Sequence, residues 1–300
     1  MLLKTKRKHI KGKEEIQKII ESNGIKYLLV NNKIFDELYE NEELKMSELD
    51  LITYIHLQIM MLNKITLSAK ELASWIGCSE KQIRVVINRL KEYKVSCNCR
   101  YSPYESKVVL TDDGEERMVS LITEKNQVVY NPSTKSNQKV KHWYPNLIPD
   151  HKKGKDKPVP VNFFLVSLKD LNLFTQGQLS RTEFITYLFL LKTYAYGKKD
   201  KDQVWMRYSL IASKTRRKLP QTTQEHIEKL KSLNIDGAQL IRQMYPNNYQ
   251  IQMEAGHETS SKFIPDFNVK TLEELKLKKE EVSFYKKEDD ILFEEVDLPF

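Results

Sequence analysis

The chain has 300 residues, with 49 Lys and Arg against 41 Asp and Glu, so its formal net charge is +8 at pH 7. This is a globular composition with a basic bias, and at roughly 100–200 residues per domain the length predicts two domains. The longest apolar stretches, such as residues 54–62, fall far short of the roughly 18–20 residues that cross a bilayer, which excludes a membrane-spanning helix.

The cysteines and the N-terminal segment indicate a cytoplasmic protein. Cys78, Cys97 and Cys99 form an odd and sparse set, which is typical of a reducing compartment rather than of a disulfide framework. The N-terminal segment is basic but has no apolar core, so it does not resemble a secretory signal. Three thiolates could in principle hold zinc, but no second paired motif lies nearby. We expect packed, reduced thiols, with no metal and no other cofactor.

The sequence offers no motif for catalysis. Gly12-Lys13, Gly154-Lys155 and Gly197-Lys198 lack the Ser or Thr and the upstream glycine of a phosphate-binding loop. The six histidines include no pair separated by one or by three residues, and no Gly-x-Ser-x-Gly segment occurs. We therefore expect a binding protein and not an enzyme.

An internal repeat organises the chain. Ile52-Thr53-Tyr54 matches Ile185-Thr186-Tyr187, 133 positions later, within longer similar segments at 46–57 and 179–190. The match continues downstream, where residues 86–91 correspond to 226–231. Two copies of one module are the simplest interpretation, and a chance resemblance is the alternative.

The repeat divides the chain into five expected segments. They are a basic N-terminal segment at 1–26, a first domain at 27–130, a linker at 131–160, a second domain at 161–255 and a tail at 256–300. The linker is assigned because 131–160 holds five of the ten prolines and seven lysines and shows no periodicity. Its positive charge either lies along phosphates or is merely solvated.

The first copy is expected to be a winged helix, in which a helix-turn-helix is followed by a β-hairpin. Ser47, Ser68 and Ser79 each predict the start of a helix, and Gln82 completes a capping box for the third. Four apolar residues of the third helix recur at helical spacing and are expected to face the core: Ile83, Val86, Ile87 and Leu90. Two β-prone runs, at 95–100 and 106–110, follow as the wing.

The second copy is expected to repeat this order. It has a short strand at 204–206, a second helix at 209–214 and a third helix that is opened by a capping box of Thr222 and Glu225. The segment 241–253 is expected to form the wing. The predicted fold class is therefore α+β, mainly α, with two tandem winged helices and an acidic, disordered C-terminal tail.

The exposed side chains of the third helices favour double-stranded DNA as the partner. A helix-turn-helix places the N-terminal part of its last helix in the major groove, where Arg, Lys, Asn and Gln read base edges. The candidate base readers are Lys81, Gln82, Arg84 and Asn88 in the first copy and Gln221, Thr223 and Gln224 in the second. The candidate phosphate contacts are Ser79, Lys214, Arg216 and Arg217, and the candidate wing contacts are Arg100, Tyr101, Lys107 and Arg242. The alternative is a protein-binding module whose charges are only solvated.

The end of the chain is acidic. From Thr271 onward there are ten acids and five lysines, and the last thirteen residues hold six acids and no base. Glu294 and Glu295, followed by Asp297-Leu298-Pro299-Phe300, resemble the C-terminal tip of bacterial single-stranded-DNA-binding proteins, although Val296 interrupts the acidic run and no oligonucleotide-binding barrel accompanies it. The resemblance implies that Phe300 and its acidic neighbours dock replication and repair proteins. A disordered acidic tail is the alternative, and in either case the tail could compete with DNA for the basic body.

The tandem arrangement from residue 27 to residue 253 resembles the two-winged-helix replication initiators of plasmids and phages, and more distantly the primosomal helicase loaders. The first resemblance implies binding to origin repeats and a homodimer formed through one winged helix. Together with the tip, it implies recruitment of host replication proteins. The alternatives are a transcriptional regulator that binds an operator, and an adaptor whose winged helices bind proteins.

Overall fold

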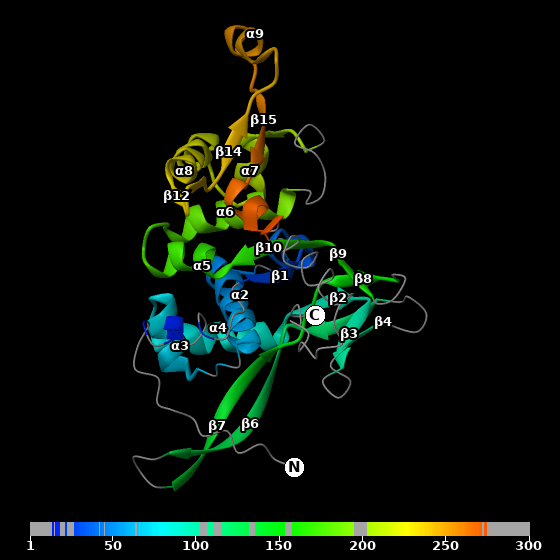
Figure 1. The fold of residues 1–300 in the computed structure, drawn as a ribbon, viewed down its shortest axis with the longest axis vertical. Helices are drawn as coiled ribbons and strands as arrows, with labels where there is room; N and C mark the ends of the chain where they lie inside the picture. Colours follow the sequence, from blue (N-terminus) through cyan, green and yellow to red (C-terminus); the bar gives the residue numbers. More distant parts are fainter. Residues whose placement is uncertain are drawn as a thin grey trace, which may run out of the picture. The chain divides into compact units, whose positions relative to one another are not determined.

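The computed structural model describes residues 14, 16–18, 22, 27–41, 43–44, 46–63, 65, 67–102, 107–110, 116–131, 136–153, 158–194, 203–271 and 273–274. The chain divides into two compact units (Figure 1). The first unit holds the described residues up to Phe163 together with Ser167–Gln178, and the second holds Phe164–Val166 and the described residues from Leu179 on. Both units combine helices with small sheets, which confirms the broad prediction of an α+β fold. Within these ranges, no helix is both long and apolar enough to cross a membrane.

Three serine-capped helices form the centre of the first unit. Strand β1 (Tyr27–Asn31) and the π-helical turn η1 (Ile34–Tyr39) precede α2 (Glu48–Leu62), α3 (Ala69–Ile76) and α4 (Glu80–Glu92). The three helices begin at capping boxes whose first residues are Ser47, Ser68 and Ser79, so the predicted helix starts are confirmed. Gly77 ends α3 at φ +82°, a left-handed conformation that glycine adopts without strain.

Helix α2 lies in the core of the first unit, and α4 packs against it. All residues of α2 from Leu49 to Met60 are buried, the polar ones included. Helix α4 buries only one face, which consists of Ile83, Val86, Ile87 and Leu90, as their spacing predicted. Burying an apolar side chain fully stabilises the fold by roughly 1.5–3 kcal/mol, so these four residues, the buried apolar seam of α4, determine which face of the helix meets solvent.

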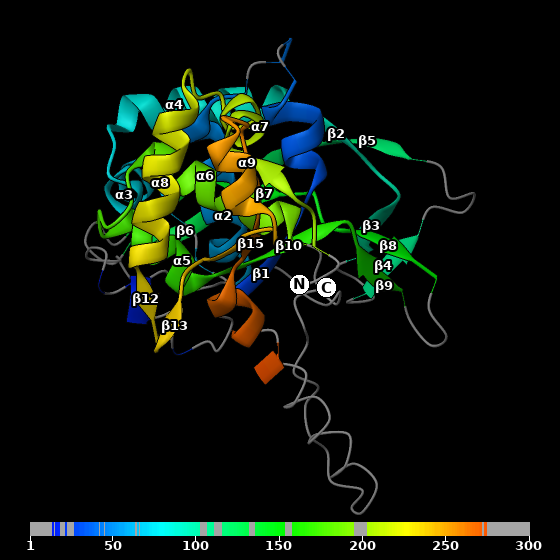
Figure 2. The same cartoon turned by 90° about the horizontal axis from the view of Figure 1, so that it is seen from above.

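The strands that follow α4 form antiparallel pairs. β2 (Lys94–Cys97) pairs with β5 (Arg117–Ser120), β3 (Cys99–Ser102) with β4 (Lys107–Leu110), β6 (Ile122–Asn131) with β7 (Ser136–Pro145), and β8 (Asp150–Lys152) with β9 (Val159–Val161). β8 lies beside β3 in both views (Figure 1 and Figure 2). The hairpin predicted at 95–100 and 106–110 is only partly correct, because the chain bends at Asn98 and Val95 pairs with Val119 instead.

Residues 131–160, which their prolines and lysines predicted to be a linker, contain paired strands. Residues 136–145 form β7, which pairs with β6 over its whole length, and β8 and β9 follow within the same segment. Pro145 and Pro160 are tolerated because each lies in a two-stranded sheet, where one edge of every strand is open. Polar residues on both faces of β6 and β7 hid the alternation by which a strand is usually recognised.

The second unit repeats the helical order of the first. Strand β10 (Phe163–Ser167) crosses the boundary between the units, and α5 (Leu168–Thr175) belongs to the first. The second unit then contains α6 (Arg181–Thr193), β11 (Met206–Arg207), α7 (Tyr208–Lys214) and α8 (Pro220–Ser232). After α8 come β12 (Asn234–Ile235), β13 (Ala238–Gln239), β14 (Arg242–Met244), α9 (Tyr249–Glu254) and β15 (Ser260–Ile264). Three of these strands form an antiparallel sheet in the order β11, β15, β14.

Two predicted features of the second unit are wrong. Helix α8 begins at Pro220, and its N-cap Leu219 makes no side-chain hydrogen bond, so the predicted capping box at Thr222 does not form. Proline favours the first helical position because its φ is already helical and it has no N–H to leave unpaired. The segment 249–253 lies in helix α9, and the strand that returns along β14 is β15, inside the segment expected to be a tail.

Matched positions support the repeat that the sequence indicated. Helices α2 and α6 both begin at capping boxes, and Tyr54 and Tyr187 are both fully buried. Each hydroxyl has an acceptor within its own unit: Tyr54 donates to the Leu147 carbonyl at 3.4 Å, and Tyr187 donates to Asn268 Oδ1 at 2.7 Å. In both copies, therefore, the hydroxyl of the matched buried tyrosine donates a hydrogen bond to a segment beyond the repeated helices.

Candidate nucleic-acid interface

Helix α4 presents the predicted polar residues to solvent. Lys81, Gln82, Arg84 and Asn88 are all exposed, and they lie on the side of the helix opposite the buried apolar seam. Arg and Lys donate to guanine, and Asn and Gln pair with adenine. The exposed face of α4 thus has the side-chain chemistry that reading base edges requires.

Ser79 and Gln82 are engaged in the cap of α4. Ser79 Oγ accepts from the Gln82 backbone N–H at 3.2 Å, and Gln82 Oε1 accepts from the Ser79 backbone N–H at 3.0 Å. Both groups are exposed, so a ligand can replace these hydrogen bonds. In this conformation, however, both side chains are engaged by backbone N–H groups of the cap.

Arg84 forms an exposed ion pair with the preceding turn of α4. Its Nη2 lies 2.5 Å from Glu80 Oε1, and the two side chains are 66% and 40% exposed. Exposed pairs at this helical spacing contribute only about 0.3–0.5 kcal/mol. Arg84 can therefore exchange Glu80 for a base or a phosphate at little cost.

An ion pair between the buried Asp50 and the partly exposed Arg89, which the sequence did not predict, fixes α4 to α2. Asp50 is fully buried, and its Oδ1 accepts from Arg89 Nη2 at 2.7 Å and from Arg89 Nε at 3.1 Å. Its Oδ2 accepts from the Ser47 backbone N–H at 2.8 Å and from the Tyr93 hydroxyl at 3.3 Å. Its partner Arg89 lies 39 residues further along the chain, and no local sequence pattern predicts an ion pair over that separation.

On helix α8 two of the three candidate readers are exposed. Gln221 and Gln224 face solvent, whereas Thr223 is fully buried and its Oγ1 has no hydrogen-bond partner among the described residues. Thr223 is therefore not a base reader in this conformation. Thr223 lies three and four residues before His226 and Ile227, so it falls on the buried face of α8. His226 Nδ1 on this face lies 3.0 Å from Thr186 Oγ1 on α6.

The basic turn between α7 and α8 is at the surface. Lys214 and Arg216 are exposed, and Arg216 has φ 58°, a left-handed conformation. Arg217 is half-buried, and its Nε donates to the Thr215 carbonyl at 2.8 Å. The turn thus gathers three cationic groups next to the N-terminus of α8.

The remaining predicted contacts are paired or lie outside the described side chains. Arg242 Nε and Nη2 donate to the Asp266 carboxylate at 2.9 and 3.0 Å, so a DNA contact by Arg242 would have to compete with this pair. Arg100, Tyr101 and Lys107 lie in strands β3 and β4, but their side chains are outside the described part of the chain. The tip residues Glu294, Glu295, Asp297, Leu298, Pro299 and Phe300 are outside it as well.

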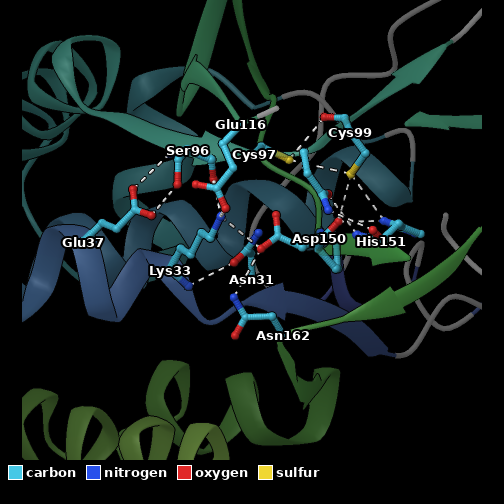
Figure 3. Close-up of polar contacts among 12 residues, drawn as sticks. Asn31, Lys33, Glu37, Ser96, Cys97, Cys99, Glu116, Asp150, His151 and Asn162 are labelled. Atoms are coloured by element: carbon cyan, nitrogen blue, oxygen red, sulfur yellow. Dashed lines mark hydrogen bonds and ion pairs between the residues drawn. The ribbon is translucent and has the colours of Figure 1, made fainter. Parts of the chain in front are cut away.

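A polar cluster in the first unit surrounds Lys33, just after β1 (Figure 3). Lys33 Nζ lies 2.6 Å from Glu116 Oε1 and 3.1 Å from Asp150 Oδ2, and it donates to the Ser96 carbonyl at 3.3 Å. Burial lowers the pKa of Lys33, but the hydrogen bonds and charges of Glu116 and Asp150 outweigh it, so the pKa is raised overall. Because its charge is paired, Lys33 contributes to packing between η1, β2 and β8 rather than to an accessible site.

The two thiols of Cys97 and Cys99 lie next to this cluster. Their Sγ atoms are 3.7 Å apart, and Cys99 Sγ is 3.4 Å from His151 Nδ1 (Figure 3). The hydrogen bond from Cys99 lowers the pKa of Cys97, and the same bond together with burial raises that of Cys99. Burial lowers the pKa of His151. Both thiols are buried, and no group of three or more His, Cys, Asp or Glu in the described part of the chain has a geometry that could hold a metal ion.

Comparisons of the chain with protein-family models, with curated proteins and with solved structures gave no match.

Proposed function

We propose that the protein binds double-stranded DNA through two winged helices, with α4 as its main base-reading helix. The proposal for the second unit is supported by the order α6, β11, α7, α8, β14 and β15, into which the short strands β12 and β13 and the helix α9 are inserted. In a winged helix the last strand lies between the other two, and β15 lies between β11 and β14. In the first unit, α2, α3 and α4 supply the three helices, and the paired strands after α4 supply the wing.

The surface of α4 carries the proposal. Its exposed residues Lys81, Arg84 and Asn88 combine two cations with an amide on a helix that the Asp50–Arg89 pair holds in a fixed orientation. Helix α8 is different, since it holds no Lys or Arg before Lys229 and Glu225 and Glu228 accompany its exposed glutamines, whereas Glu80 on α4 is paired with Arg84. Carboxylates oppose a close approach to phosphates. Base reading therefore belongs to α4, and the basic turn before α8 binds phosphates.

The biological role that we propose is initiation of replication on a plasmid or phage. Two DNA-binding modules in one chain fit a repeated site, and the C-terminal tip from Glu294 to Phe300 would recruit host replication proteins. The protein would act by binding and assembly, without catalysis. A transcriptional regulator with the same DNA-binding surface is the competing role.

Selection of duplexes from a random pool by the full-length protein tests this proposal. Enrichment of directly repeated sites supports an initiator, and a single operator-like site favours the regulator. If no sequence is enriched at low salt, sequence-specific DNA binding is refuted. A variant that lacks the last seven residues should bind the selected DNA normally and fail to support replication of a plasmid that carries the repeats.

Arg84→Ala tests the role of α4 within this experiment. The substitution should weaken binding to the selected site by about 1–3 kcal/mol and relax discrimination at one base pair. Val85→Ala is the matched control, because Val85 is an exposed neighbour without charge. Equal losses of Arg84→Ala on selected and random DNA would make Arg84 a phosphate contact instead of a reader.

A further inference from the structure

Strands β6 and β7 form a long hairpin that the winged-helix core does not require. The two strands pair over ten positions, from Ile122 with Pro145 to Asn131 with Ser136, and they form a sheet by themselves. At about 3.3 Å per residue the paired strands reach about 33 Å. In Figure 1 they extend past the helices of the first unit. An isolated two-stranded ribbon gains little stability from its own contacts, so its length calls for another explanation.

The base of the hairpin is fixed beside α4. Glu124 on β6 forms ion pairs with Lys91 of α4 and with Lys141 of β7, the latter at 2.7 Å, and it also accepts from Trp143 Nε1 at 3.4 Å. These contacts lower the pKa of Glu124 to about 2, chiefly through the hydrogen bonds from Lys141 and Lys91. The direction of the hairpin is therefore tied to the helix to which base reading is assigned.

The charge of the hairpin has a single sign beyond its base. From Lys125 to Pro149 the sequence holds four lysines and no Asp or Glu. Among the described side chains of this part, Lys125, Asn126, Ser136, Asn137 and Lys141 are exposed, whereas His142 and the side chains from Pro145 to Pro149, apart from the half-buried Asn146, are buried. Two carboxylates flank this stretch, and both are paired: Glu124 with Lys91 and Lys141, and Asp150 with Lys33.

We propose that the β6–β7 hairpin is an arm that lies along the duplex bound by α4 and contacts its phosphates beyond the base-reading site. The inference rests on the proposed DNA binding of α4. A two-stranded ribbon fits a DNA groove, and the arm spans about one helical turn, which is about 34 Å. The lysines of the arm complement the phosphate charge, and its amide and hydroxyl side chains can donate to phosphate oxygens.

Neutralising the arm tests this inference. In the full-length protein, Lys125→Gln with Lys139→Gln removes two charges from strands β6 and β7 and leaves Glu124 and its partners in place. Each lost phosphate contact should lower the slope of log affinity against log salt by about 1, so the double variant should lose about 2. Affinity should fall equally on selected and random duplexes, and the hydroxyl-radical footprint should become shorter on one side.

Lys152→Gln with Lys153→Gln is the matched control, because both lysines are exposed in the same unit but outside the hairpin. An equal loss in this control would show a general charge effect and overturn the arm. If the folded arm variant keeps the salt slope and the footprint while Arg84→Ala still weakens binding, the proposed role of the hairpin is refuted and the proposed DNA binding of α4 is not. Absence of binding by the unmodified protein would instead refute the proposed function.

Discussion

Replacing Arg89 by Met should destabilise the first unit far more than its partly exposed position suggests. The substitution leaves the carboxylate of Asp50, which is fully buried, without the two hydrogen bonds that Arg89 donates. Breaking a buried ion pair by removing one partner costs about 3–5 kcal/mol. The Arg89 side chain is 42% exposed, so water screens one end of the pair, and we expect a loss of about 2–3 kcal/mol.

Urea denaturation followed by tryptophan fluorescence can measure this loss. Trp75 and Trp143 lie in the first unit and Trp205 in the second, so a Trp205→Phe background makes the signal report on the first unit. Arg84→Met is the control, because its exposed pair with Glu80 should contribute no more than about 0.5 kcal/mol. In the double variant with Asp50→Asn, the losses should be less than additive by about 1–3 kcal/mol. If Arg89→Met and Arg84→Met have equal effects, Arg89 does not anchor α4.

The other expectations concern caps, burial and pH. Ser79→Ala should cost about 1 kcal/mol in urea unfolding, because it removes the acceptor for the Gln82 N–H at the start of α4; a change below about 0.3 kcal/mol would contradict the observed cap. Thr223→Val should leave DNA affinity unchanged and raise stability by up to about 1 kcal/mol, since the buried Thr223 hydroxyl has no hydrogen-bond partner among the described residues; loss of affinity would restore Thr223 as a reader. Because the pKa of Glu124 is lowered from 4.5 to about 2, its contribution to stability is complete above pH 4.5 and is lost as the pH falls toward 2. Glu124→Gln should therefore flatten the acid limb of the stability profile, and an unchanged limb would show that its ion pairs do not stabilise the fold.

Local signals predicted the helices of the first unit well. Ser47, Ser68 and Ser79 cap helices as expected, and Gly77 stops α3, because these residues act through backbone groups within one turn. The same reasoning failed at α8. There Thr222 offered an equally good capping pattern, but the N-cap is Leu219, and Pro220 starts the helix three residues earlier than predicted.

Long-range features could not be predicted in this way. The pairing of β6 with β7 was missed because polar residues on both faces leave no alternation to detect. The Asp50–Arg89 pair links α2 and α4. Each helix was predicted correctly by itself, but the periodicity of one helix does not determine how it is rotated against the other. The exposure of the candidate readers of α4 was predicted because their positions follow from the buried apolar face of the same helix. Thr223 was placed wrongly because it lies one turn before Ile227, on the buried face of α8.

Titration of the full-length protein with a fluorescent duplex between 50 and 200 mM salt tests the central proposal most directly. A protein that neutralises six or more phosphates should lose affinity by about 10³-fold or more over this range, and log affinity should fall linearly with log salt. That result is the one that we predict. An affinity that does not change with salt, or no binding at 50 mM, would contradict the assignment of this protein as a DNA-binding protein.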